Sequence, residues 1–230
     1  MKINSDKIYS VITGDIVHSS RLPLVKRKKL HKIMVESSIE LRQAFKNITP
    51  FDVDIFRGDS WQMIVAVPMY VLKVALFYRS ILRAKMESHK FNTRMAIALG
   101  HIDFIPGSRV AEGHGEAYEL SGKAFENLSK STNMIFVFPN YKHEKCLNAI
   151  VQLIDAFSTN WSDKQALAIT GALRGWKQEK IAKTCWKNEI TQQAVAQHLD
   201  RAGWNAVEKG LIFFEDCLKN TIKDNNNYKR

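Results

Sequence analysis

Hydrophobic and polar residues follow two periods along the chain, and the change of period divides it into strands and helices. Apolar runs of strand length fall at 7–17, 51–56, 61–67, 91–103 and 133–139. Between them, apolar residues recur every three or four positions, the helical period, at 24–46, 70–88, 117–131 and 142–155. This order predicts an α+β fold of ferredoxin-like βαββαβ type, an α/β sandwich in which helices cover a largely antiparallel sheet.

The pattern changes after residue 155. Residues 156–230 have few β-branched runs. Their pattern predicts only helices, at 162–174, 178–184, 190–201 and 204–218. We therefore predict an α/β domain over 1–155, a small all-α domain over 156–220 and a disordered tail over 221–230.

Charge and composition narrow the class of protein. The 230 residues carry a net charge of +11, and both predicted domains are basic, which makes polyanions such as nucleic acid or nucleotides plausible partners. No apolar run approaches the roughly 20 residues that span a bilayer, and the first residues lack a signal-peptide pattern. Three widely spaced cysteines are typical of reduced thiols. These features predict a cytoplasmic protein without a membrane partner.

A run of cations marks the predicted helix 24–46. Its polar face holds Lys26, Arg27, Lys28, Lys29 and Lys32. We interpret this run as a solvated helix face, and the alternative is a patch that faces a phosphate group.

Two aspartates carry the strongest chemical signal. Asp15 follows Gly14 at the end of an apolar run, and Asp59 follows Gly58 in a predicted hairpin turn. If the sheet brings the two carboxylates together, they repel by roughly 4 kcal/mol at about 4 Å, and a divalent cation relieves that repulsion. Alternatively, Asp15 caps the turn that follows it and Asp59 belongs only to the hairpin.

The predicted helices around 178–201 have the pattern of buried and exposed positions that is typical of a helix-turn-helix. Val195 and Leu199 form the buried side of the second helix, and Ala182 lets the first pack closely against it. The side chains left exposed are those that reach base edges in a major groove, and they predict a DNA-binding surface: Thr191, Gln192, Gln193, Gln197 and Arg201. The alternative is a helical bundle used for dimerisation.

These helices also resemble region 4 of sigma factors. The resemblance rests on the strings 162–169, Gln178-Glu179-Lys180-Ile181-Ala182 and 191–197. The connection between the two helices is longer than in the tight form of the motif, with Cys185-Trp186-Lys187-Asn188-Glu189 where a glycine turn is usual.

The N-terminal part resembles the SatD family of bacterial proteins, which is similar to class III nucleotidyl cyclases. The strings that carry the resemblance run in order over residues 8–138: Gly14-Asp15-Ile16-Val17-His18-Ser19-Ser20-Arg21, Arg57-Gly58-Asp59-Ser60, 94–100 and 115–124. The resemblance implies that Asp15 and Asp59 are ligands of Mg²⁺ or Mn²⁺. It also implies a nucleotide-binding site and a head-to-tail homodimer.

The resemblance assigns further residues to that nucleotide site. The Ile16 carbonyl would add a metal ligand, and the backbone N–H groups of Val17, His18 and Ser19 would face phosphates. Arg57, next to the second aspartate, joins the same site.

Two positions depart from the cyclase pattern. Glu119 stands where the cyclases have an Asn that orients the ribose, and Lys123 stands where they have a transition-state Arg. Lys123 is therefore the candidate catalytic residue, although a lysine cannot present the bidentate fork of an arginine. These changes favour a site that binds a nucleotide over one that turns it over.

Together the patterns predict a bacterial regulator in which a degenerate cyclase-like sensor of a nucleotide or another phosphorylated ligand precedes a DNA-binding helix-turn-helix. The alternative is an active nucleotidyl cyclase or nucleotidyltransferase with an appended regulatory domain. A third possibility is an interaction scaffold that has lost both chemistries.

Overall fold

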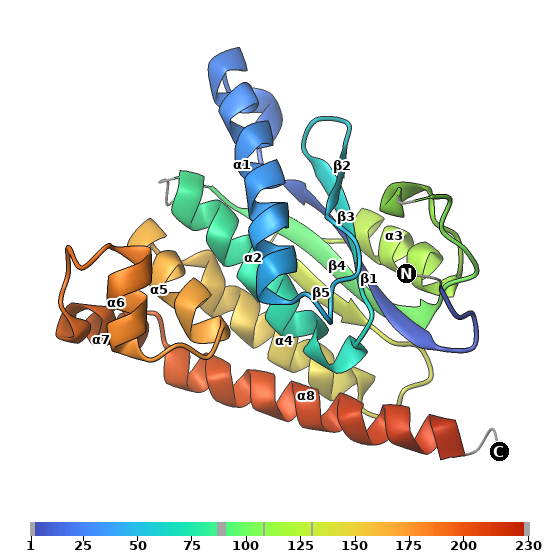
Figure 1. Cartoon of the computed structure of the whole chain (residues 1–230). Helices are drawn as coiled ribbons and strands as arrows, with labels where there is room; N and C mark the ends of the chain where they lie inside the picture. The colour runs from blue at the N-terminus through green and yellow to red at the C-terminus, as the bar shows by residue number, and fades with distance from the viewer. Residues whose placement is uncertain (1–2, 87–90, 108, 130, 228–230) are drawn as a thin grey trace.

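A five-stranded sheet forms the centre of the molecule (Figure 1). The computed structural model describes residues 3–86, 91–107, 109–129 and 131–227. The strands are β1 (Ile8–Ile16), β2 (Asp54–Phe56), β3 (Ser60–Val65), β4 (Thr93–His101) and β5 (Met134–Val137). Their spatial order is β2-β3-β1-β4-β5, which places the long strand β1 in the middle.

The first four strands have the predicted βαββαβ arrangement. Helix α1 (Leu24–Ala44) joins β1 to β2, a hairpin joins β2 to β3, and α2 (Val71–Met86) joins β3 to β4. The neighbouring pairs among these four strands are all antiparallel. Strand β5 follows α3 (Glu116–Glu126) and pairs in parallel with β4. The predicted α+β class is thereby confirmed.

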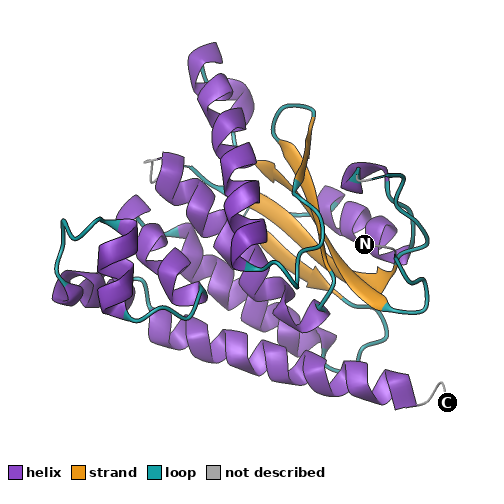
Figure 2. Ribbon diagram, viewed as in Figure 1, coloured by secondary structure: helices purple, strands orange, loops and turns teal. Residues whose placement is uncertain are grey.

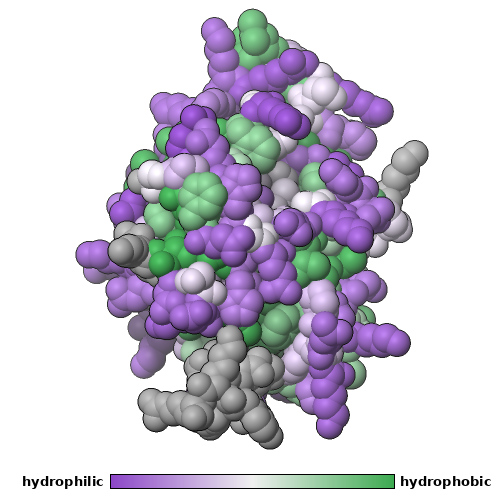
Figure 3. All heavy atoms as spheres, turned by 90° about the vertical axis from the view of Figure 1, so that its right-hand side faces the viewer, coloured by the Kyte–Doolittle hydropathy of each residue, from purple (hydrophilic) through white to green (hydrophobic). Residues whose placement is uncertain are grey.

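Helices cover both faces of the sheet (Figure 2). Helices α1, α2 and α4 (Glu144–Thr159) bury their apolar sides in one large cluster with the sheet, and α3 covers the opposite face with a smaller cluster. On the side of the molecule where α3 lies, hydrophilic side chains predominate and the hydrophobic ones form separate patches (Figure 3).

The C-terminal helices share the larger of the two cores. They are α5 (Asp163–Leu173), α6 (Gln178–Cys185), α7 (Gln192–Arg201) and α8 (Trp204–Asn227). Ile169, Val195 and Phe214 belong to the same buried cluster as the sheet residues, and α5 packs along α2. The division into separate α/β and helical domains stays a prediction, and the two parts contact each other through a continuous apolar interior.

Two boundaries differ from the sequence pattern. Helix α4 continues to Thr159, so the predicted division at 155/156 lies within its last turns. Helix α8 continues to Asn227 through most of the predicted tail, and 228–230 lie outside the described residues. Among the described residues, no helix combines the length and the apolar character that crossing a membrane requires.

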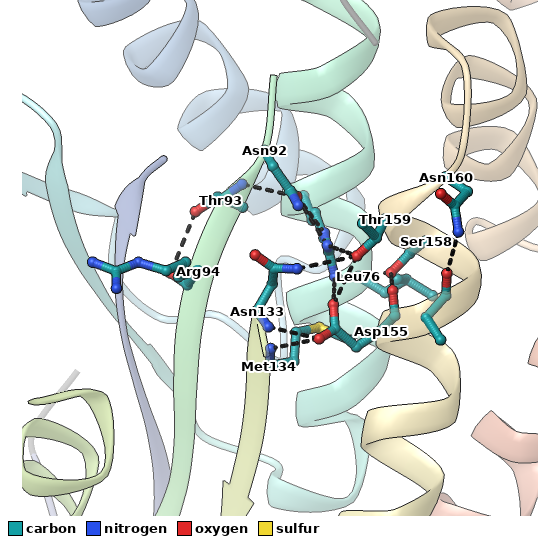
Figure 4. Close-up of polar contacts among 12 residues, drawn as sticks. Leu76, Asn92, Thr93, Arg94, Asn133, Met134, Asp155, Ser158, Thr159 and Asn160 are labelled. Atoms are coloured by element: carbon teal, nitrogen blue, oxygen red, sulfur yellow. Dashed lines mark hydrogen bonds and ion pairs between the residues drawn. The ribbon is translucent and has the colours of Figure 1, made fainter. Parts of the chain in front are cut away.

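A buried ion pair explains why the chain stays ordered through the predicted division. Arg79 of α2, 2% exposed, donates to the Asp155 carboxylate at 2.7 Å and to Ser158 Oγ at 2.8 Å. The other oxygen of Asp155 accepts the backbone N–H groups of Asn133 and Met134 at 2.7 and 3.1 Å (Figure 4). Because each charged oxygen has a donor, this network joins α2, α4 and the start of β5 in the interior.

A second arginine of α2 holds the connection from α4 to α5. Arg83 donates to the carbonyl oxygens of Thr159 and Trp161, at 2.8 and 2.5 Å, and to that of Phe91 at 2.9 Å. Burial, together with the nearby charge of Arg79, lowers the pKa of Arg83 to about 10. The guanidinium therefore remains charged at neutral pH and fixes the α4–α5 connection against the body of the fold.

Candidate functional site

A cavity of about 880 Å³ lies between α1, the loop after β1 and the tip of the β2–β3 hairpin. Its lining combines five basic or imidazole side chains, two hydroxyls, two carboxylates and apolar groups: Arg27, Lys28, His31, Lys32, Arg57, Ser19, Ser20, Glu36, Asp59, Leu30 and Val35. With histidine neutral, four cations face two anions. The cavity is therefore cationic and suited to an anionic ligand.

The hairpin tip presents Asp59 to this cavity through an unusual backbone. Arg57 and Gly58 both have positive φ, at 51° and 87°. Glycine adopts this region freely, whereas an arginine in it costs of order 1–3 kcal/mol. The turn therefore holds Arg57 in a costly conformation at the rim of the cavity.

The loop after β1 meets the hairpin through a hydroxyl–carboxylate contact. Ser19, the first residue of a short 3-10 helix (Ser19–Arg21), donates its Oγ–H to Asp59 Oδ2. His18, just before it, has a left-handed φ of 58°. Thus the structure brings Ser19, Arg57 and Asp59 together, as predicted for one site, although their roles toward a ligand stay predictions.

Arg27 fixes the same loop from the side of α1. Its guanidinium donates to the carbonyl oxygen of Leu22 at 2.9 Å and to that of Ser20. Both contacts are with loop backbone, so Arg27 positions the hydroxyl groups of the loop while its charge remains at the cavity.

Asp15 has a different partner. Arg94 of β4 lies opposite it in the sheet and donates through Nε to Oδ1 at 3.1 Å and through Nη2 to Oδ2 at 2.6 Å. This bidentate hydrogen bond raises the pKa of the Arg94 guanidinium, and the Arg94 side chain also lies over the ring of Phe125 in α3. A protein cation thus balances the charge of Asp15, a partner that the sequence pattern did not indicate.

Gly14 and Val17 have structural partners as well. A Cβ atom on Gly14 would lie 2.4 Å from the Trp61 ring, so the glycine accommodates the indole. The Val17 N–H donates to the carbonyl oxygen of Asn92 at 2.9 Å and does not face the cavity as a free donor. Ile16 is buried and ends the ladder with β4 opposite Thr93.

The two positions that depart from the cyclase pattern lie on the other face of the sheet. Glu119 and Lys123 are exposed on α3, which covers the face opposite to α1. The lining of the cavity comes from α1 and the hairpin side, so Lys123 is placed apart from the cluster of Ser19, Arg57 and Asp59. Its catalytic role stays a prediction.

Sequence reasoning favoured a solvated face for the cations of α1 and kept a patch that faces a phosphate group as the alternative. Arg27, Lys28 and Lys32 belong to the basic run that we interpreted as a solvated face, and all three line the cavity. The sequence feature that indicates a shared surface is their spacing, because residues 28 and 32 are about one helical turn apart and lie on one side of the helix.

The predicted nucleic-acid surface on α7 is open to solvent. Its five residues, Thr191, Gln192, Gln193, Gln197 and Arg201, are all exposed, while Val195 and Leu199 are buried. Thr191 also caps the helix, because its Oγ accepts the N–H of Ala194 at 3.2 Å.

The connection between α6 and α7 shows how the missing glycine is replaced. Residues 186–191 form it, and Lys187 and Asn188 both take positive φ, at 51° and 67°. Trp186 stacks on His198 of α7 with ring centroids 5.8 Å apart. Burial, with the charges of Lys164 and Arg201, lowers the pKa of His198 and so favours its neutral form.

No family model matches the chain, and no curated protein matches it. Among solved structures it is similar to the guanylyl cyclase Cya2, with a TM-score of 0.41 and 9% identity over 59% of this chain and 77% of that one. Two structures of a bacterial light-regulated adenylyl cyclase have TM-scores of 0.41 and 0.40 at 14% identity, over 56% of this chain and 75% and 43% of theirs. The resemblances to the SatD family and to sigma-factor region 4 stay predictions.

Proposed function

We propose that this protein is a regulator that binds a nucleotide or another phosphorylated ligand in the α1–hairpin cavity and binds DNA through α7. The observation that carries the proposal is the composition of the cavity. Four cationic side chains and two serine hydroxyls surround a volume sufficient for a small phosphorylated molecule, and Leu30 and Val35 add apolar surface for a base or similar group.

The proposal includes a divalent cation that is bound by one of the two aspartates. Asp59 suits such a role, because its carboxylate is half-buried at the cavity next to a hydroxyl group. Asp15 suits it less well, because each of its oxygens accepts a hydrogen bond from Arg94. The cavity has its own cations, so we expect binding of phosphate to persist in part when the divalent cation is removed with a chelator.

The ligand site is tested by thermal unfolding of the full chain with each nucleoside triphosphate, with and without Mg²⁺. A ligand at about a hundred times its Kd adds roughly 2.7 kcal/mol to the free energy of unfolding and raises the Tm by roughly 2–4 °C. In the Arg57→Gly variant we expect this shift to disappear. Without ligand the variant should be as stable as the wild type or more stable by up to about 2 kcal/mol, because glycine relieves the cost of the positive φ at this position.

A matched control replaces a cation outside the lining. Lys29→Glu changes charge on the same helix at an exposed position and should leave the ligand-induced shift in place. A wild-type protein with no shift for any nucleotide or for inorganic pyrophosphate would contradict the ligand site. Formation of a cyclic product, abolished in Asp59→Asn, would favour the alternative of an active cyclase.

DNA binding is tested separately with the full chain at about 50 mM salt. If α7 reads base edges, Gln193→Ala or Gln197→Ala should cost about 1–3 kcal/mol for the preferred sequence and relax the preference. Lys187→Ala, in the connection before α7, should weaken binding to all sequences alike and reduce the salt slope by about one. Equal binding of all sequences by the wild type and both glutamine variants would contradict the proposed role of α7.

A further inference from the structure

The middle of α8 exposes two large apolar side chains next to each other. Ile212 is 53% and Phe213 is 49% exposed, although the helix buries Leu211 and Phe214 on its other side. Neighbouring large apolar groups on a regular helix, away from either end, are typical of a surface that another helix covers.

The charges around this pair have a symmetric arrangement. Lys209 lies three residues before Ile212, and Asp216 lies three residues after Phe213. Both are exposed, and among the ion pairs of the described residues neither has a partner. Residues three apart lie on one side of a helix, so the two charges flank the apolar pair along the same surface.

We propose that a second copy of this chain covers the surface, with the two α8 helices antiparallel about a twofold axis between Ile212 and Phe213. In that arrangement each residue lies opposite the one at equal distance from the axis on the other helix. Ile212 of one copy meets Phe213 of the second copy, and Lys209 meets Asp216 of the second copy. Symmetry makes both contacts twice. Farther from the axis, Asn205 lies opposite Asn220 on the same side of the helix, and the exposed Lys219 lies opposite Ala206 at its edge.

Charge complementarity favours a second copy over other occupants. The chain carries a net charge of +11, so most of its surface repels another copy and attracts polyanions. On the exposed side of α8, Lys209 and Asp216 place one cation and one anion at equal distances from the proposed axis, while Glu215 is only partly exposed. This exposed side is therefore its own complement, which an antiparallel pair requires.

The proposed contact runs from residue 205 to residue 220, a length of about 24 Å along the helix. This is a small interface, so we expect dimerisation in the micromolar range. Helices α6 and α7 lie beyond the N-terminal end of α8 (Figure 1), so the two copies would carry their α7 helices at opposite ends of the α8 pair. The pairing itself does not depend on ligand or DNA.

The test is sedimentation equilibrium of the full chain between about 1 and 100 µM. We expect a monomer–dimer equilibrium for the wild type and a Kd raised by about tenfold in Lys209→Glu, because two attractive contacts become repulsive. The double variant Lys209→Glu with Asp216→Lys should restore the wild-type Kd, a rescue that general destabilisation would not give. Phe213→Asp should be monomeric throughout the range.

Lys29→Glu serves as the matched control, because it makes the same change of charge on α1, on the opposite side of the molecule from α8 (Figure 1). Its Kd should equal that of the wild type. A wild type that stays monomeric at about 100 µM would overturn the proposal, as would a dimer whose Kd is unchanged in Lys209→Glu or is not restored in the double variant.

Discussion

Replacing Asp155 with alanine is expected to lower the free energy of unfolding by about 3–5 kcal/mol. The variant leaves the buried guanidinium of Arg79 without its counter-charge and removes the acceptor of the Asn133 and Met134 N–H groups. Burial already lowers the pKa of Arg79, and the charge and hydrogen bond of Asp155 oppose that effect. Urea unfolding at pH 7 measures the loss.

Asp52→Ala is the control for this prediction. Asp52 also pairs with an arginine, Arg42 at 3.1 Å, but both side chains are more than half exposed. The loss there should be within about 1 kcal/mol, because water screens the pair. If Asp155→Ala is as mild as Asp52→Ala, the buried network does not join α2, α4 and the start of β5 as described.

The second large effect is expected for Trp61→Ala, at about 3–5 kcal/mol of unfolding free energy. Trp61 is fully buried, contacts Tyr78 edge to face at 5.0 Å and donates its indole N–H to Thr93 Oγ1 at 3.1 Å. Removing the ring leaves a void beside Gly14 and removes the indole donor to Thr93 Oγ1, which keeps its own hydrogen bond to the Asp15 carbonyl oxygen. Chemical denaturation of Trp61→Ala and of Trp61→Phe measures the two losses. Trp61→Phe removes the hydrogen bond but keeps an aromatic ring, so the difference between the two variants gives the cost of the void.

Phe104→Ala provides a matched aromatic deletion. Phe104 is 52% exposed and stacks on His114 at the surface. We expect a loss of about 1 kcal/mol or less. A loss similar to that of Trp61→Ala would contradict the larger contribution to stability that burial gives Trp61.

Much of the fold follows from local pattern. The alternation of apolar runs with helical periods predicted the βαββαβ order, because each period reports which side of an element is buried. The turn at Arg57-Gly58 could also be predicted from the sequence, since a glycine between two apolar runs is a hairpin signal. The continuity of the chain near Asp155 could not be predicted from the sequence. It depends on the ion pair of Asp155 with Arg79, which lies 76 residues away, and composition does not indicate such a pair.

Part of the candidate site could be predicted, because the local pattern also defines which strands become neighbours. Ser19, Arg57 and Asp59 lie in two strings whose strands become neighbours in the sheet, so their meeting follows from the topology. The pairing of Asp15 with Arg94 depends on the register between β1 and β4, which the sequence alone did not define. The spacing of the α1 cations indicates that they share one side of the helix, but it does not define that this side lies against the hairpin, which is a tertiary property.

The place of α8 in the core has a consequence for synthesis on the ribosome. Phe214 packs edge to face on Phe136 of β5 at 5.1 Å, and Leu218 is also fully buried. The sheet is complete once β5 has emerged, but part of its apolar face stays uncovered until α8 has also been translated. A premature stop within α8 would therefore leave an aggregation-prone surface in an otherwise folded protein.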